Sequence, residues 1–563
     1  MDNFLNILKN NRTIILYVLL ALTCINLYDA WKRDTAPLLP VKSPAPTAET
    51  SEISALPAID HKTELPSVPK TVQASTSIVT TNQEIPFINV KTDLLDLKIS
   101  LQGGNIIAAS LEDYPISIEH LETKFQLLNN MPELHFIIQS GIVAKNQQNA
   151  PSHLSLFSAS QTQYTLKEGA DSLVVELVWN QNEIEVVKRF TFKRKSYEIA
   201  LTQKVSNQST ENWTGWPYQQ LERKPPIKSG SMLDGSAYTY TGGAYYKPDT
   251  KYQKISFDEI KDEAIDIKTN QGWVSFIQHY FLAAIVPNAE TETTLFSKGL
   301  SDKRYIMGIR LPMLEVASGQ TSQVESTLYI GPKLQNHLKS VAEGLELTVD
   351  YGWLTVISQP LFWLLSKIHS YIGNWGWAII ILTLLIKLAF YKLSETSYRS
   401  MANMRKMTPR IQALKERYGD DRQRMNQAMM EMYKTEKINP LGGCLPMLVQ
   451  IPVFIALYWM LMETVELRQA PFIFWIQDLS VKDPFFILPL LMGASMFFQQ
   501  KLNPPPPDPM QAKMMSMLPI VFTGLFAFFP AGLVLYWFIN NLASILQQWY
   551  ITRKIENADK VKK

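Results

Sequence analysis

The spacing of apolar residues divides the chain into regions of different character. Between residues 85 and 335, apolar side chains recur at every second position in short stretches bounded by Gly, Asn and Pro. A period of two is typical of strands with one buried face. This pattern predicts one large antiparallel β-sandwich over 85–335. Its clearest stretches contain Leu95, Leu97, Ile99 and Leu101, then Phe190 and Phe192, then Val324, Leu328 and Ile330.

From residue 350 onward the apolar residues form longer runs. Residues 350–371 carry apolar side chains at helical spacing, which predicts an amphipathic helix lying in a membrane interface. The run 372–393 is long enough to cross a bilayer as a helix. Four more runs of that kind follow within 439–551.

The N-terminal part of the chain has a different composition. An apolar run behind Lys9 and Arg12 predicts an uncleaved signal anchor within residues 1–33, because no small-x-small cleavage site follows it. Residues 34–84 are rich in Pro, Ser, Thr and Ala without an apolar period, so they predict a flexible linker.

A polar segment, 394–438, separates the run 372–393 from the later runs. We expect a helical hairpin here, with one helix beginning at Thr408-Pro409 and ending at Gly419. Asp420-Asp421 can cap the next helix.

The distribution of charge predicts an orientation in the membrane. Eleven Lys/Arg against six Asp/Glu lie from Lys392 to Lys437, and the tail 552–563 has five against two. The positive-inside rule places both segments in the cytoplasm and residues 463–483 outside. Six spans satisfy this arrangement, with both termini in the cytoplasm and the β region outside.

Lys387 lies inside the run 372–393. A cation near the middle of a membrane costs about 2.5–3.5 kcal/mol on insertion scales, so a functional role is one interpretation. The alternative is that its ammonium group extends to the headgroups, since Lys392 follows only five residues later.

Uncharged polar residues in the spans favour the functional interpretation. They could line a wet cavity with Lys387, or they could be hydrogen bonds between helices worth about 0.6 kcal/mol each. The residues in question are Thr383, Gln450, Tyr536, Asn540 and Ser544.

Several classes of protein are excluded by what the sequence lacks. The chain contains no GxxxxGK[ST] and no HExxH motif, and its last histidine is His369. Its two cysteines lie far apart in apolar stretches, and its net charge of +3 does not indicate nucleic-acid binding. We therefore expect no enzymatic activity, no cofactor and no metal.

Long motifs in the chain resemble the YidC family of membrane protein insertases, of the Gram-negative type with a large periplasmic domain. The helical part contributes GNWGWAIIILT at 373–383, MTPRIQALKERYGDD at 407–421, NPLGGCLPMLVQIPVF at 439–454, LRQAPFIFWIQDLS at 467–480 and PAGLVLYW at 530–537. The β region contributes VKTDLLDL at 90–97 and LTVDYGWL at 347–354.

This resemblance implies a chaperone that inserts and folds proteins in the bacterial inner membrane, alone or beside the Sec translocon. It implies five helices around a hydrophilic groove, with nascent membrane proteins, the ribosome and lipid as partners. The family's groove arginine aligns with Lys387. A lysine keeps the positive charge but lacks the planar guanidinium group with its five N–H donors. The hairpin cations expected to meet partners are Arg405, Lys406, Arg410, Lys415, Arg417, Arg422 and Arg424.

Two rival classes remain open at the level of sequence. A solute transporter or channel could use Lys387 as an anion site. An envelope sugar-binding protein could use its spans only to anchor the β region, whose many Trp and Tyr residues are compatible with a binding cleft.

Overall fold

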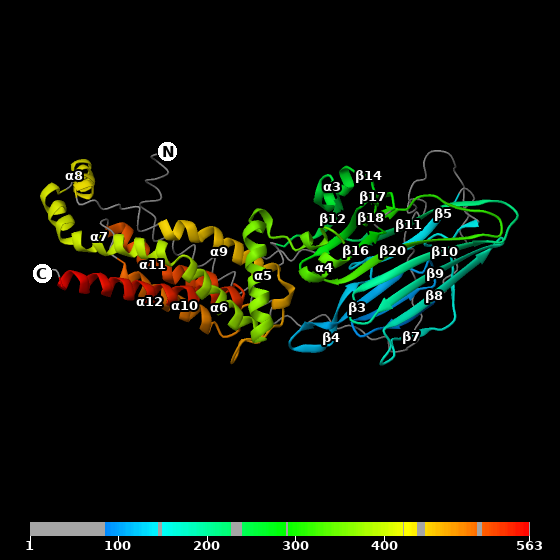
Figure 1. Cartoon of the computed structure of the whole chain (residues 1–563), viewed down its shortest axis with the longest axis horizontal. Coiled ribbons are helices and arrows are strands. Elements are labelled where there is room, and N and C mark those ends of the chain that lie inside the picture. Colours follow the sequence, from blue (N-terminus) through cyan, green and yellow to red (C-terminus); the bar gives the residue numbers. More distant parts are fainter. Residues whose placement is uncertain are drawn as a thin grey trace, which may run out of the picture. The chain divides into compact units, whose positions relative to one another are not determined.

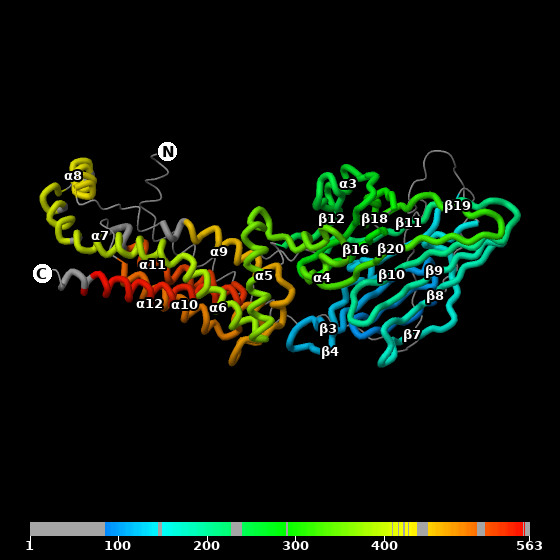
Figure 2. The backbone as a smooth tube through the Cα atoms, viewed as in Figure 1, coloured from blue at the N-terminus to red at the C-terminus, as the bar shows by residue number. Residues whose placement is uncertain are grey.

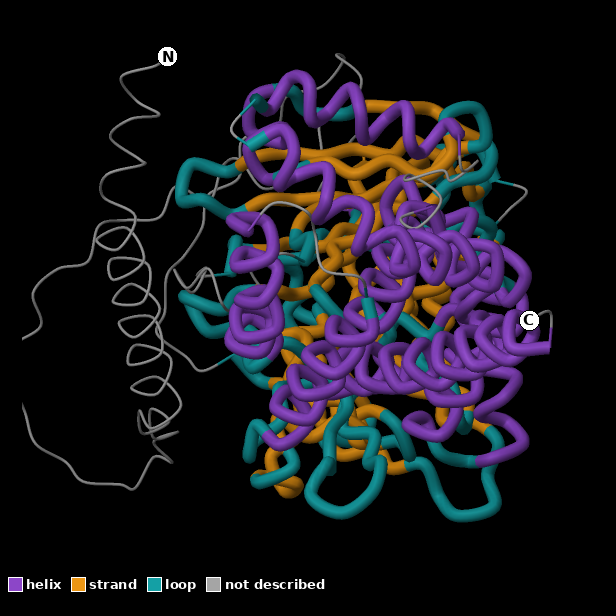
Figure 3. Tube along the Cα trace, turned by 90° about the vertical axis from the view of Figure 1, so that its left-hand side faces the viewer, coloured by secondary structure: helices purple, strands orange, loops and turns teal. Residues whose placement is uncertain are grey.

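The computed structural model describes the residues that follow the predicted anchor and linker, which lie outside the described part of the chain. Strands and helices occupy separate stretches of sequence, apart from two short helices among the strands. Figure 3 shows the helices in purple and the strands in orange. The described ranges are 85–144, 149–226, 239–288, 291–419, 421–435, 445–503 and 509–561.

The strands form two sheets (Figure 1). The larger sheet has the order β14 (Asp266–Thr269), β17 (Thr293–Gly299), β18 (Tyr305–Arg310), β11 (Trp213–Arg223), β5 (Phe136–Ala144), β3 (Ile106–Ser117), β2 (Leu95–Ser100), β1 (Phe87–Lys91) and β7 (Gln163–Thr165), with β19 (Leu314–Val316) beside β11 and β4 (His120–Leu128) beside β3. The second has the order β13 (Lys251–Ile255), β12 (Gly242–Lys247), β15 (Trp273–Gln278), β16 (Phe281–Pro287), β20 (Thr321–Pro332), β10 (Glu198–Asn207), β9 (Ile184–Lys193), β8 (Ser172–Gln181) and β6 (Ser158–Ala159).

The apolar residues that alternate along the predicted strands form the core between these sheets. Leu95, Leu97 and Ile99 of β2 are buried, as are Phe190 and Phe192 of β9. The prediction of a wholly antiparallel arrangement is wrong at one edge, where β1 and β7 pair in parallel. These two strands are separated by a long stretch of chain, so no hairpin turn sets their relative direction.

Lys188 is a charged side chain buried inside the sandwich. The ammonium of Lys188 donates to Gly103 O at 2.6 Å, to Ser140 O at 2.7 Å and to Ser140 Oγ at 2.8 Å. Burial lowers the pKa of Lys188 to about 7, because the charged form loses its hydration. Its three donors are thus matched by three oxygens, which is what a buried polar group requires.

From Gln335 onward, the described residues are mainly helical (Figure 2). Two short helices, α3 (Phe257–Asp262) and α4 (Gln335–Val341), accompany the strands, and 3₁₀ turns occur at Leu345–Thr348, Gly352–Leu354 and Val465–Leu467. The longer helices are α5 (Thr355–Ile372), α6 (Trp375–Ala389), α7 (Tyr391–Tyr418), α8 (Arg422–Thr435), α9 (Leu445–Glu463), α10 (Ile487–Leu502), α11 (Pro509–Phe526) and α12 (Ala531–Val561).

Helix α12 connects several of the other helices. It packs against α6, α10, α7 and α9, whereas α11 packs mainly against α10. The views of Figure 1 and Figure 2 show α12 running alongside α6 and α10. The polar residues of α12 are therefore placed to connect several helices.

The predicted span 372–393 differs from a single straight helix. Helix α6 ends at Ala389, and α7 begins at Tyr391 after a bend of 66°. In the described residues no single helix meets a length-and-hydropathy test for crossing a membrane, although this bent pair does so together. Shorter apolar helices lie at Val449–Glu463 and Lys513–Phe526.

The predicted start of the first hairpin helix is wrong, and its end is confirmed. Helix α7 runs through Pro409 without a break at Thr408, so this proline lies inside the helix and not in its first turn. The helix ends at Tyr418, and Gly419 follows with a φ of +53°, a conformation that favours glycine. Asp421 Oδ1 then accepts a hydrogen bond from Arg424 N at 3.1 Å, as expected of a helix cap.

Candidate functional site

The start of α6 is fixed to the loop between α9 and α10. Asn374 caps the helix by accepting from Trp377 N at 3.1 Å, and its amide donates to Pro471 O and Phe472 O, each at 3.2 Å. Gly376 lies so close to Phe472 that an added Cβ would be 2.0 Å from that ring. Because its first turn is held in this way, α6 presents Lys387 from its last turn in a defined direction.

Lys387 meets α12. Its ammonium, which is partly buried, donates to Ser544 Oγ at 2.8 Å, and Ser544 Oγ donates to Asn540 O at 2.7 Å. Within the described ranges no carboxylate forms an ion pair with Lys387. Among the described residues, the hydrogen-bond partner of this cation is therefore a hydroxyl and not a carboxylate.

A second polar contact lies one helical turn away on α12. Gln450 of α9 donates from Nε2 to Asn540 Oδ1 at 2.6 Å, and Gln450 also hydrogen-bonds Tyr536. Tyr536, Asn540 and Ser544 share one face of α12, as their spacing of four predicts. We call the set Lys387, Gln450, Tyr536, Asn540 and Ser544 the α12 polar site.

Thr383 differs from the other predicted residues. Its hydroxyl donates to Ile379 O of its own helix at 2.7 Å, and its side chain is buried. It lies one turn before Lys387 but is not hydrogen-bonded to it. A threonine that bonds back to its own helix is a common way to satisfy the hydroxyl inside a helix.

The structure adds polar contacts that the sequence analysis did not single out. Tyr398 of α7 hydrogen-bonds Ser544, and Asn541 donates to Ser495 Oγ of α10 at 3.1 Å. Gln548 donates to Leu502 O at 3.2 Å, at the end of α10. Asn541 and Gln548 are seven residues apart on α12, and this spacing in an apolar segment was the available signal.

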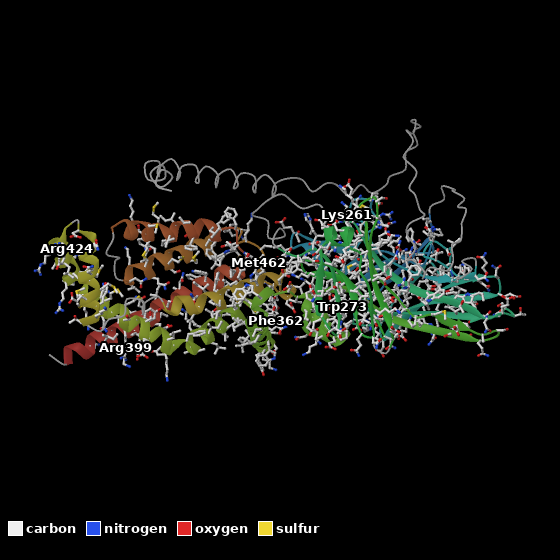
Figure 4. The ribbon with its side chains drawn as sticks, turned by 90° about the horizontal axis from the view of Figure 1, so that it is seen from above. Lys261, Trp273, Phe362, Arg399, Arg424 and Met462 are labelled. Carbon is white, nitrogen blue, oxygen red and sulfur yellow. The ribbon has the colours of Figure 1, made fainter. Side chains whose placement is uncertain are left out.

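The hairpin cations lie apart from the α12 polar site. Arg405, Lys406, Arg410, Arg417 and Arg424 are exposed along α7 and α8, and Figure 4 labels Arg424 among them. The side chains of Lys415 and Arg422 lie outside the described residues. The exposed cations present positive charge to the surroundings of the hairpin.

The loop between α9 and α10 is held by buried charged groups. Asp483 accepts from Trp475 Nε1 at 3.0 Å and from Leu488 N at 2.7 Å, which fixes the start of α10. At the end of α9, Glu463 pairs with Lys333 at 2.9 Å, and both side chains are buried. Burial also raises the pKa of Glu466 to about 7.

Comparisons with known proteins cover nearly the whole chain. A model of the YidC periplasmic domain matches residues 87–364, and a model of the 60Kd inner membrane protein family matches residues 367–559. The membrane protein insertase YidC of Nitrosococcus oceani is 48% identical over 97% of this chain and 99% of its own length. The chain belongs to the YidC family of membrane protein insertases.

A second YidC relative, from Methylococcus capsulatus, is 49% identical over 94% of this chain and 96% of its own length. A crystal structure of an active YidC insertase with its first transmembrane domain resolved is 17% identical, covers 83% of this chain and 95% of that chain, and superimposes with a TM-score of 0.38. Membership of the YidC family confirms the predicted class, a β-sandwich periplasmic domain followed by a helical region of an inner membrane protein.

Proposed function

We propose that this chain inserts and folds integral membrane proteins through the α12 polar site, alone or with the Sec translocon and without ATP hydrolysis. The observation that carries this proposal is the contact between Lys387 and Ser544, a cation with a hydroxyl partner. Such a cation is free to attract acidic residues of an incoming polar segment. An internal carboxylate would have cancelled this attraction.

The physical task is to move a short polar segment past hydrocarbon. A polar site inside the helices shortens the apolar path, and Gln450 and Asn540 offer transient hydrogen bonds to the segment's backbone. The client's own apolar helix then moves into lipid. Its burial supplies about 25 cal/mol per Å² of apolar surface, which drives the step.

The proposed topology has six spans and follows the distribution of charge. Residues 1–33 form the anchor and 34–84 the linker, and the region 85–335 lies in the periplasm. Helix 350–371 lies in the interface, the second span is 372–393, and spans three to six lie within 439–551. The hairpin 394–438 and the tail 552–563 lie in the cytoplasm, where their cations receive nascent chains or ribosomal RNA.

The proposal predicts that the purified chain in liposomes inserts a small single-span client without ATP. Insertion is measured as protease protection of the client's translocated segment, with empty liposomes as the control. Efflux of a labelled anion is measured from the same liposomes. Anion flux without client insertion would overturn the proposal and favour a transporter that uses Lys387 as an anion site.

A further inference from the structure

The strands β3 and β4 continue beyond the sheet as a two-stranded ribbon. Strand β2 pairs with β3 only as far as Leu111, and β5 pairs with β3 only at Ile106. After Leu111, β4 is the strand paired with β3 among the described residues. We call residues 113–124 the ribbon tip.

The ribbon tip exposes three aliphatic side chains around its turn, which together are called its aliphatic face. Ile116, Ile118 and Leu121 are 50%, 43% and 58% exposed. Ser117 pairs with His120, so Ile116 and Leu121 are the residues next to this pair, and Ile118 lies in the turn between the two strands. Single exposed apolar residues are ordinary on a protein surface, but three gathered around one turn indicate a contact.

The base of the ribbon is fixed to the second sheet. Phe281 of β16 stacks on Phe125 with ring centroids 4.3 Å apart. Tyr114 contacts the ring of Phe281 edge-on, with centroids 5.4 Å apart. The guanidinium of Arg468 lies 5.7 Å from the centroid of Phe281. The direction of the ribbon tip is therefore set by packing.

The ribbon tip is also hydrogen-bonded to the loop that joins α9 and α10. Arg468 Nη2 donates to Pro115 O at 2.6 Å and to Ile116 O at 3.1 Å. Gln469 Nε2 donates to Pro115 O at 2.9 Å. Arg468 follows the last residue of α9, Glu463, by only five positions. The loop itself exposes Phe474 and Phe485.

We propose that the ribbon tip inserts its aliphatic face into the outer leaflet of the membrane. This rests on the proposed topology, in which the loop between α9 and α10 lies at the outer membrane surface. Three side chains are far too few for a stable protein partner, which needs about 800 Å² on each side. They are sufficient for an interfacial lipid contact next to existing spans.

The charges beside the aliphatic face define the lipid it prefers. Glu119 and Glu122 flank the exposed residues and are themselves exposed. Carboxylates are repelled by anionic headgroups, so a zwitterionic surface favours the contact. Raising the share of phosphatidylglycerol is therefore expected to weaken it.

The contact is tested by fluorescence quenching on the full chain in nanodiscs of phosphatidylethanolamine and phosphatidylglycerol. Cys24 and Cys444 are replaced by serine, and an environment-sensitive dye is placed at Leu121→Cys. We expect lipids labelled near the headgroup to quench this dye several-fold more than a dye at Val174→Cys. Val174 is a matched control because it is 46% exposed and lies on β8 of the other sheet.

A third position separates membrane contact from mere proximity. A dye at Glu122→Cys, which follows Leu121 on the alternate face of β4, is expected to be quenched less than the dye at 121. Equal quenching at 121 and 174 in a sample that inserts a client would overturn the ribbon contact and leave the proposed function intact. Selective quenching at position 121 in a sample that fails to insert a client would support the ribbon contact and overturn the proposed function.

Discussion

Replacing Lys387 by alanine is expected to reduce insertion of clients with an acidic translocated segment about tenfold, which corresponds to about 1.4 kcal/mol. Clients with a neutral segment should insert nearly as well as before, because their segment gains nothing from the cation. The comparison uses two clients that differ only in the charge of the translocated segment. Insertion is measured by protease protection in liposomes with matched amounts of each variant.

The direction of the effect depends on charge. Lys387→Arg should retain activity because charge and reach survive, whereas Lys387→Glu should impair acidic clients more than alanine does, since attraction becomes repulsion. Lys392→Ala is the matched control, because Lys392 is an exposed lysine outside the α12 polar site. Equal insertion of both clients by every variant would mean that Lys387 only extends to the headgroups.

Replacing Glu463 by glutamine is expected to destabilise the chain by about 3–5 kcal/mol, because it leaves the buried ammonium of Lys333 without a counter-charge. Lys333 Nζ has one further oxygen nearby, Thr348 O at 3.3 Å, which cannot neutralise it. The measurement is the denaturant midpoint of the full-length chain in detergent micelles. The denaturant midpoint should fall strongly because the side chains of Lys333 and Glu463 are both buried.

The double variant Lys333→Met, Glu463→Leu provides the sharper comparison. It removes both charges, so much of the lost stability should return. The exposed pair Arg189–Glu176 is the control, and Glu176→Gln should change stability by no more than about 1 kcal/mol. A double variant as unstable as Glu463→Gln alone would show that packing at these positions, and not the unpaired charge, is responsible.

The strands of the periplasmic domain were predictable because each strand follows from the apolar pattern of its own few residues. An alternation such as Leu95, Leu97 and Ile99 places one face in the core whatever the rest of the chain does. The parallel pairing of β1 with β7 was not predictable, since these strands meet across a long separation in sequence. Local pattern specifies strands, whereas the neighbours of a strand depend on the whole topology.

Two helix boundaries could not be predicted from the residues around them. Apolar residues continue through Phe390, and no proline or glycine marks the bend that ends α6. At Pro409 the opposite occurs, because a residue that usually begins a helix lies within α7. In both places the helix boundary does not follow from the preference of a single residue.

The members of the α12 polar site were predicted, but their pairings were not. Spacing placed Tyr536, Asn540 and Ser544 on one face of a helix. Only the fold shows that Lys387 contacts Ser544 from 157 residues away and that Gln450 contacts Asn540 from 90 residues away. Lys333 and Glu463 are 130 residues apart, and no sequence pattern links them.

We infer that the translocated polar segment of a client passes along the α12 polar site. The most direct measurement is disulfide crosslinking between cysteines in that segment and Asn540→Cys, in a chain without Cys24 and Cys444. The control is Leu542→Cys, which lies two residues along the same helix, at similar depth, and is 38% exposed on another face. We expect the polar segment to crosslink to position 540 and not to position 542 during insertion. Equal crosslinking at both positions, or crosslinking at 542 alone, would contradict it.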